Sequence, residues 1–234
     1  MQKINILGMS LTDYSLREAI GITDRFLGGG SLNTILFVSA KILVGAGISA
    51  KQQAWIEGAD LIVWSDAEII RQAGITAKNR IHEVENQEYL KEILRRLGRG
   101  KKSLYLLGES EEELEKLEYD LKNFREDMNI IGKGIAGSIQ TEWDDQANRI
   151  NDFAPVAVIS RMPFERQVEI VESMKNFLNA EIWLALDYEM LPADRKVPFW
   201  KKILSKWDHH VFQKLLAEYR HTDRPDGESD TTLK

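Results

Sequence analysis

The sequence predicts an α/β fold with a mainly parallel sheet and helices on both faces. Short apolar runs recur along the 234 residues, and segments with helical periodicity separate them. The runs are continuous in hydrophobicity rather than alternating, which is typical of strands whose two faces are both covered. Strands and helices that alternate along a chain favour parallel pairing, and binding residues then gather at the carboxyl ends of the strands.

The predicted strands follow from the apolar runs taken in order. They are INILGM (4–9), TILFVSA (34–40), DLIVWS (60–65), SLYLLG (103–108), NIIGKG (129–134), PVAVIS (155–160) and EIWLAL (181–186). Between them, three pairs of residues have capping-box or similar spacing ahead of periodic stretches and predict helix starts. These pairs are Ser15 with Glu18, Ser110 with Glu113, and Thr141 with Asp144.

The segment 195–220 predicts a basic amphipathic helical appendage to an α/β domain that spans 1–194. From Phe199 to Tyr219 the apolar residues form one helical stripe that includes Trp200 and Trp207. The segment holds seven Lys or Arg against two acids, a local balance of +5, while the rest of the chain is acidic. The polar residues 221–234 have little to bury and predict a disordered tail.

Three partners suit this appendage. Its stripe could pack on the protein's own core or against another chain, since a large apolar patch is costly to leave in water. Alternatively, the tryptophans and lysines favour the surface of an anionic membrane. The membrane-facing residues would then be Trp200, Lys201, Lys202, Lys206 and Trp207.

Composition excludes several classes of protein. The chain has 43% hydrophobic residues, a net charge of −6 and no cysteine, so disulfides and zinc-thiolate sites are excluded. No apolar stretch reaches the roughly 18 residues that span a bilayer, and the first residues lack the core of a signal peptide. We therefore expect a cytoplasmic protein, peripheral on the inner face of the cell membrane if the appendage meets lipid. No broad basic surface with interleaved aromatic residues predicts nucleic-acid binding.

Asp66 is the candidate catalytic residue. It ends the apolar run DLIVWS and precedes AEIIRQAG, which has helical character. One interpretation is a helix N-cap, a position that favours Asp. The other is a general base, because a carboxylate at the end of a strand can face a cleft and take a proton from a hydroxyl.

Other motifs are less specific. Glycines after the predicted strands could let backbone amides receive an anion, but no dinucleotide fingerprint or P-loop is complete. The triplet at 187–189 (DYE) is too short to assign a metal, and the four histidines have no ligand spacing, so no metal site is predicted. No spacing supports a Ser-His-Asp or Cys-His arrangement.

The order of these segments resembles the WecG/TagA/CpsF family of bacterial glycosyltransferases over residues 3 to 220. The matching pieces are the opening strand and helix (4–27), TILFVSAKILVGA (34–46), EGADLIVWSDAEII (57–70), NRIHE (79–83), SLYLLGESEEELEKL (103–117), NIIGKGIAG (129–137) and ADRKVPFWKKILSKW (193–207). The resemblance implies a Rossmann-like domain that transfers an N-acetylhexosamine, with inversion, from a UDP-sugar to a lipid-diphosphate-linked sugar. Members need no metal ion or other cofactor.

The resemblance also implies roles for individual residues. Asp66 would be the catalytic Asp, and its carboxylate would activate the acceptor hydroxyl. The donor-binding residues would be Ser39, Arg80, Gly108, Gly137, Glu165, Arg195 and Lys196. Among these, Arg195 and Lys196 would lie near the donor diphosphate and stabilise the charge on the departing UDP.

The sequence departs from the family pattern at several of these positions. Ser39 replaces an Asn, Ala67 replaces the Gly after the catalytic Asp, 163–166 (PFER) replaces Pro-Lys-Gln-Glu, and 185–189 (ALDYE) replaces Gly-Gly-Ser-Phe-Asp. Where glycine is lost, a Cβ enters space that a nucleotide would approach. Two hypotheses therefore follow: a divergent glycosyltransferase, or a non-catalytic relative that acts as partner or regulator of an active envelope enzyme. They differ in whether Ser39, Asp66, Arg80 and Glu165 line an open cleft or a filled one.

Overall fold

The computed structural model describes residues 2–46, 49–137, 140–188, 190, 213–214 and 216–217. Its main feature is a six-stranded sheet with the strand order β4-β3-β8-β7-β5-β6, in which every pair is parallel. The strands are β3 (Asn33–Val38), β4 (Leu61–Trp64), β5 (Leu104–Gly108), β6 (Ile130–Ile135), β7 (Ala157–Arg161) and β8 (Ile182–Leu186). The predicted α/β class and parallel sheet are confirmed.

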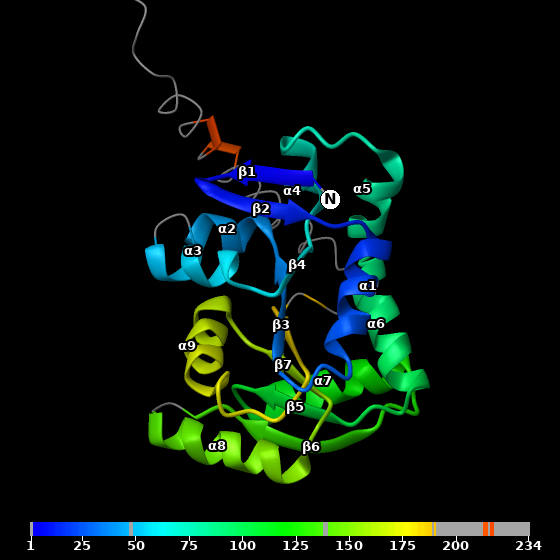
Figure 1. Ribbon diagram of the computed structural model, residues 1–234, viewed down its shortest axis with the longest axis vertical. Coiled ribbons are helices and arrows are strands. Elements are labelled where there is room, and N and C mark those ends of the chain that lie inside the picture. The colour runs from blue at the N-terminus through cyan, green and yellow to red at the C-terminus, as the bar shows by residue number, and fades with distance from the viewer. Residues whose placement is uncertain are drawn as a thin grey trace, which may run out of the picture.

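Helices cover both faces of this sheet, as Figure 1 shows. One face carries α2 (Ala40–Ala46), α3 (Ala50–Glu57), α8 (Gln140–Phe153) and α9 (Phe164–Met174), and the other carries α1 (Leu16–Phe26), α6 (Glu88–Arg99) and α7 (Glu111–Phe124). Alternate residues of one strand therefore enter different cores: Leu36 and Val38 pack with the first group, Ile35 and Phe37 with the second. Burial on both faces explains why the strands are apolar throughout.

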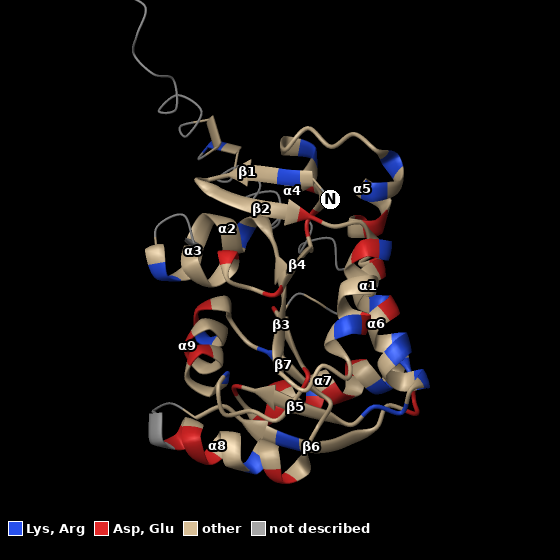
Figure 2. Cartoon of the chain, viewed as in Figure 1, with Lys and Arg blue, Asp and Glu red and all other residues tan. Residues whose placement is uncertain are grey.

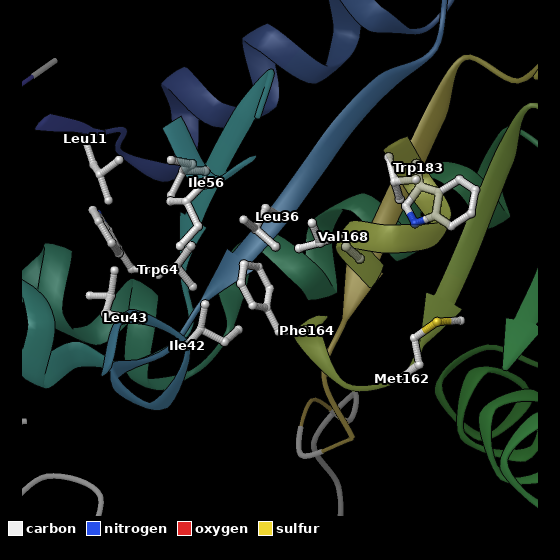
Figure 3. Close-up of a cluster of buried hydrophobic side chains, with 14 of the residues drawn as sticks. Leu11, Leu36, Ile42, Leu43, Ile56, Trp64, Met162, Phe164, Val168 and Trp183 are labelled. Carbon is white, nitrogen blue, oxygen red and sulfur yellow. The ribbon is translucent and has the colours of Figure 1, made fainter. Parts of the chain in front are cut away.

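The first predicted strand was wrong. The run 4–9 contains the end of β1 (Gln2–Ile6), a turn at Leu7 and Gly8, and the start of β2 (Met9–Asp13). Both turn residues have positive φ, and the two strands form a separate antiparallel hairpin. Figure 3 shows Leu11 of this hairpin beside Trp64 and Leu43, so the hairpin covers the β4 end of the first core.

Two of the three predicted helix caps are confirmed. The side chain of Ser15 accepts a hydrogen bond from the Glu18 backbone in a complete capping box, and that of Ser110 accepts one from the Glu113 backbone. Thr141 was predicted wrongly as a cap, because α8 already begins at Gln140. Periodicity locates a helix well, but its first residue is less certain.

The connections of the sheet diverge between β5 and β7. After β5 the chain enters α7 on one face, whereas after β7 it enters α9 on the other face. Adjacent strands whose connections leave toward opposite faces form a topological switch point, the usual ligand position in open α/β sheets. β3 leads into α2, and β4 leads into α4 (Ala67–Gln72) and α5 (Lys78–Glu85), whose buried residues share the first core with α2.

The predicted appendage (195–220) and tail (221–234) lie almost wholly outside the described residues. Within them, 213–214 and 216–217 are helical, and Leu216 is buried in the same core as the hairpin. Gln213 donates a hydrogen bond to Glu68 of α4 at 3.3 Å. Among the described helices, none combines the length and apolar character needed to cross a bilayer.

Candidate active site

The carboxyl edge of the sheet brings five predicted site residues to one side of the molecule. Ser39 follows β3, Asp66 follows β4 by two residues, Gly108 ends β5, Gly137 follows β6, and Glu165 is the second residue of α9 after β7. In a parallel sheet all these ends face the same way, so the resemblance and the topology select the same edge.

Asp66 is the N-cap of α4. Its backbone is extended, with φ −133°, and its Oδ1 accepts a hydrogen bond from the Glu68 backbone amide at 2.9 Å. Capping fixes the carboxylate at the start of the helix, next to the end of β4. The cap interpretation is thus confirmed, and the same geometry leaves a carboxylate at the edge where a substrate would bind.

Ser39 and Glu165 both lie near α2. The Ser39 Oγ accepts a hydrogen bond from the Ile42 backbone amide at 3.3 Å, at the start of α2. A Cβ built on Gly45 of the same helix would lie 3.7 Å from the Glu165 Oε1, so this carboxylate faces α2. Ser39 follows β3 and Glu165 follows β7, and β8 lies between these two strands.

Arg80 of α5 is held in an ion-pair network. Its Nη2 lies 2.7 Å from Asp13 Oδ1, its Nη1 lies 3.1 Å from Glu83 Oε2, and its side chain is 12% exposed. Arg80 also lines a cavity together with Ser65, the residue before Asp66, but the free space there is about 20 Å³. Such a space holds about one water molecule, so the described residues leave no room for a sugar at this point.

The two predicted donor-binding glycines have packing roles. A Cβ on Gly108 would lie 3.2 Å from Leu114 Cγ, and one on Gly137 would lie 2.4 Å from Glu142 Cβ. Gly108 thereby lets α7 pack closely on β5. The first turn of α7 already carries three glutamates, Glu111, Glu112 and Glu113, which repel an anion at this helix start.

Sequence reasoning missed a polar cluster at the carboxyl ends of β5, β7 and β8. The Tyr188 hydroxyl donates a hydrogen bond to Glu109 Oε2, and Glu109 Oε1 lies 3.9 Å from Arg166 Nε. Burial, together with the bond to Glu109, raises the pKa of the Tyr188 hydroxyl. Glu109 is visible in the sequence as a charged residue directly after a strand, but its partners depend on the order of the strands.

The remaining predicted residues, Arg195, Lys196, Trp200, Lys201, Lys202, Lys206 and Trp207, lie outside the described residues. The same holds for Glu189 of the acidic triplet. Within the described ranges, no group of three His, Cys, Asp or Glu side chains could hold a metal ion.

The parallel sheet with its helices and the polar carboxyl edge define a doubly wound α/β protein with a site at its strand ends. The family model described as Glycosyl transferase WecG/TagA/CpsF family matches residues 4–188, most of the chain. The chain therefore belongs to this glycosyltransferase family, as the resemblance predicted. No curated protein matches it.

Proposed function

We propose that the protein is a divergent inverting glycosyltransferase of cell-envelope polysaccharide or glycolipid synthesis. It would transfer an N-acetylhexosamine from a UDP-sugar to a lipid-diphosphate-linked sugar. Family membership supports the reaction class. The observation that carries the proposal is the position of Asp66, a carboxylate fixed at the carboxyl end of β4 by its cap bond.

In this proposal Asp66 acts as the general base. Its carboxylate takes the proton of the acceptor hydroxyl while the hydroxyl oxygen bonds to the anomeric carbon of the donor sugar. The bond from that carbon to the UDP oxygen breaks on the opposite side, which inverts the configuration. Arg195 and Lys196, by the resemblance, neutralise the charge on the departing diphosphate, a role that cationic side chains can fill without a metal ion.

A lipid-linked acceptor requires an approach to the membrane. The appendage carries Trp200, Lys201, Lys202, Lys206 and Trp207, and each Lys or Arg near an anionic surface contributes roughly 1 kcal/mol of binding. We propose that this segment positions the protein on the inner face of the cell membrane.

The test of the base is Asp66→Asn. Asparagine also caps helices, so we expect the free energy of unfolding to stay within about 1 kcal/mol of the wild type. Transfer to a lipid-linked acceptor, followed by UDP release, should fall by a factor of about 10² to 10⁴. Asp127→Asn, at an exposed carboxylate on the opposite edge, is the control and should keep full activity. Full activity in Asp66→Asn would exclude Asp66 as the base.

A second candidate is a non-catalytic relative that acts as partner or regulator of an active envelope enzyme. The engaged guanidinium of Arg80 and the small cavity beside it favour this candidate. Calorimetric titration with UDP, UDP-N-acetylmannosamine and UDP-N-acetylglucosamine, with and without magnesium, separates the two. Micromolar binding of a nucleotide that Arg195→Ala abolishes supports the transferase function. No binding at millimolar nucleotide supports the non-catalytic relative.

A further inference from the structure

Three side chains that follow different strands meet over the carboxyl end of β7. Glu109 follows β5, Arg166 lies in the first turn of α9 after β7, and Tyr188 follows β8. Since β7 lies between β5 and β8, the hydrogen bond from Tyr188 to Glu109 crosses the end of β7. This is the switch point, where an open α/β sheet usually binds its ligand.

Arg166 is held close to Glu109 by its surroundings. It donates a hydrogen bond to the carbonyl of Gly137, pairs with Glu169 at 3.1 Å, and lies 5.8 Å from the ring centre of Trp143. Trp143 itself donates to the same carbonyl at 2.7 Å. The Arg166 side chain is 21% exposed, so these contacts orient it without burying it completely.

The carboxylate of Glu109 and the guanidinium of Arg166 suit the ribose and the phosphate of a nucleotide, respectively. A carboxylate accepts hydrogen bonds from sugar hydroxyls, as acidic residues do for ribose in dinucleotide-binding folds. A guanidinium donates to phosphate oxygens in a fixed fork. Figure 2 shows the acidic residues along α7, which would repel a phosphate on the β5 side. The phosphate therefore belongs on the α9 side, at Arg166, and the ribose on the β5 side, at Glu109.

We propose that Glu109 binds a ribose hydroxyl of the donor nucleotide, that Arg166 binds its phosphate, and that the Tyr188 hydroxyl occupies the ribose position in the free protein. The inference rests on the proposed function and adds residues that the family resemblance does not provide. Nucleotide entry then requires the bond between Tyr188 and Glu109 to open.

The test compares the binding of UDP, 2′-deoxy-UDP and 3′-deoxy-UDP by calorimetry. The wild type should bind UDP about tenfold more tightly than at least one deoxy compound, the loss expected for a hydrogen bond to a charged group. Glu109→Ala should abolish this preference. Tyr188→Phe should bind UDP several-fold more tightly and keep the preference, and Arg166→Gln should weaken all three compounds equally.

The control is Glu112→Gln, which removes a carboxylate from the same helix start at a side chain that is 76% exposed. It should leave both affinity and preference unchanged. An unchanged preference in Glu109→Ala, or weaker UDP binding in Tyr188→Phe, would overturn the inference while the transferase proposal stands. If neither the wild type nor Tyr188→Phe binds UDP at millimolar concentration, the donor site and this inference fail together. Melting curves of each variant establish that it is folded.

Discussion

At the residue scale, the ion pair of Arg161 and Asp120 holds α7 against β7. Arg161 Nη1 lies 2.7 Å from Asp120 Oδ2, and the two side chains are 2% and 6% exposed. Arg161 also donates to the Glu113 carbonyl at 3.2 Å. Because Arg161 ends β7, this buried pair joins α7 to the strand over which Glu109, Arg166 and Tyr188 meet.

Asp120→Ala should therefore destabilise the fold by about 3 kcal/mol, because it removes the closest and most buried carboxylate of the Arg161 guanidinium and leaves only Glu113 Oε2 at 3.6 Å. Chemical denaturation measures the change in the free energy of unfolding. Glu112→Ala, at an exposed pair with Lys116, should change it by less than about 1 kcal/mol. A loss of similar size in both variants would show that the buried pair does not anchor α7.

At the element scale, the sequence predicted most of the sheet because its strands are buried on both faces. TILFVSA and EIWLAL are apolar whichever face a residue meets, so their pattern needs no knowledge of the fold. INILGM misled because the turn at Leu7 and Gly8 is hidden inside an apolar run. The contact of Glu109 with Tyr188 could not be predicted, since it requires β8 and β5 to flank β7, and no local signal encodes that order.

The contribution of the α1 capping box to the stability of the fold can be measured. Ser15→Ala removes the acceptor for the Glu18 backbone amide and the hydroxyl that donates to the Glu18 side chain, while the bond from the backbone amide of residue 15 remains. We expect a loss of about 1 kcal/mol in the free energy of unfolding. Ser173→Ala is the matched control, because Ser173 lies within α9 and does not cap a helix. It loses only the hydrogen bond from its hydroxyl to the Glu169 carbonyl, and alanine has the higher helix propensity. An equal change in the free energy of unfolding in Ser15→Ala and Ser173→Ala would mean that the capping box does not stabilise α1.

At the scale of the whole molecule, the hairpin, α4 and the described residues of the appendage (213–214 and 216–217) share one end of the sheet. Leu216 is 9% exposed in the core that holds hairpin residues, and Gln213 bonds to Glu68, two residues from Asp66. Part of the amphipathic stripe thus packs on the protein's own core. Membrane contact would therefore use residues of the appendage other than Leu216.

If the appendage contacts a membrane, as proposed, the carboxyl edge of the sheet should face the lipid. Gln213 of the appendage bonds to Glu68 of α4 at the carboxyl edge. The basic residues Arg95, Arg99 and Lys101 lie in the last turns of α6 or just beyond its end, ahead of β5 and so at the amino edge. Figure 2 shows Lys and Arg residues along this part of α6. We expect Glu replacements at Lys201, Lys202 and Lys206 to reduce sedimentation with anionic liposomes several-fold, since each lysine contributes roughly 1 kcal/mol. The same replacements at Arg95, Arg99 and Lys101 make an equal change in charge and should have little effect. If the second set releases the protein and the first does not, the amino edge faces the lipid, and Asp66 points away from any lipid-linked acceptor.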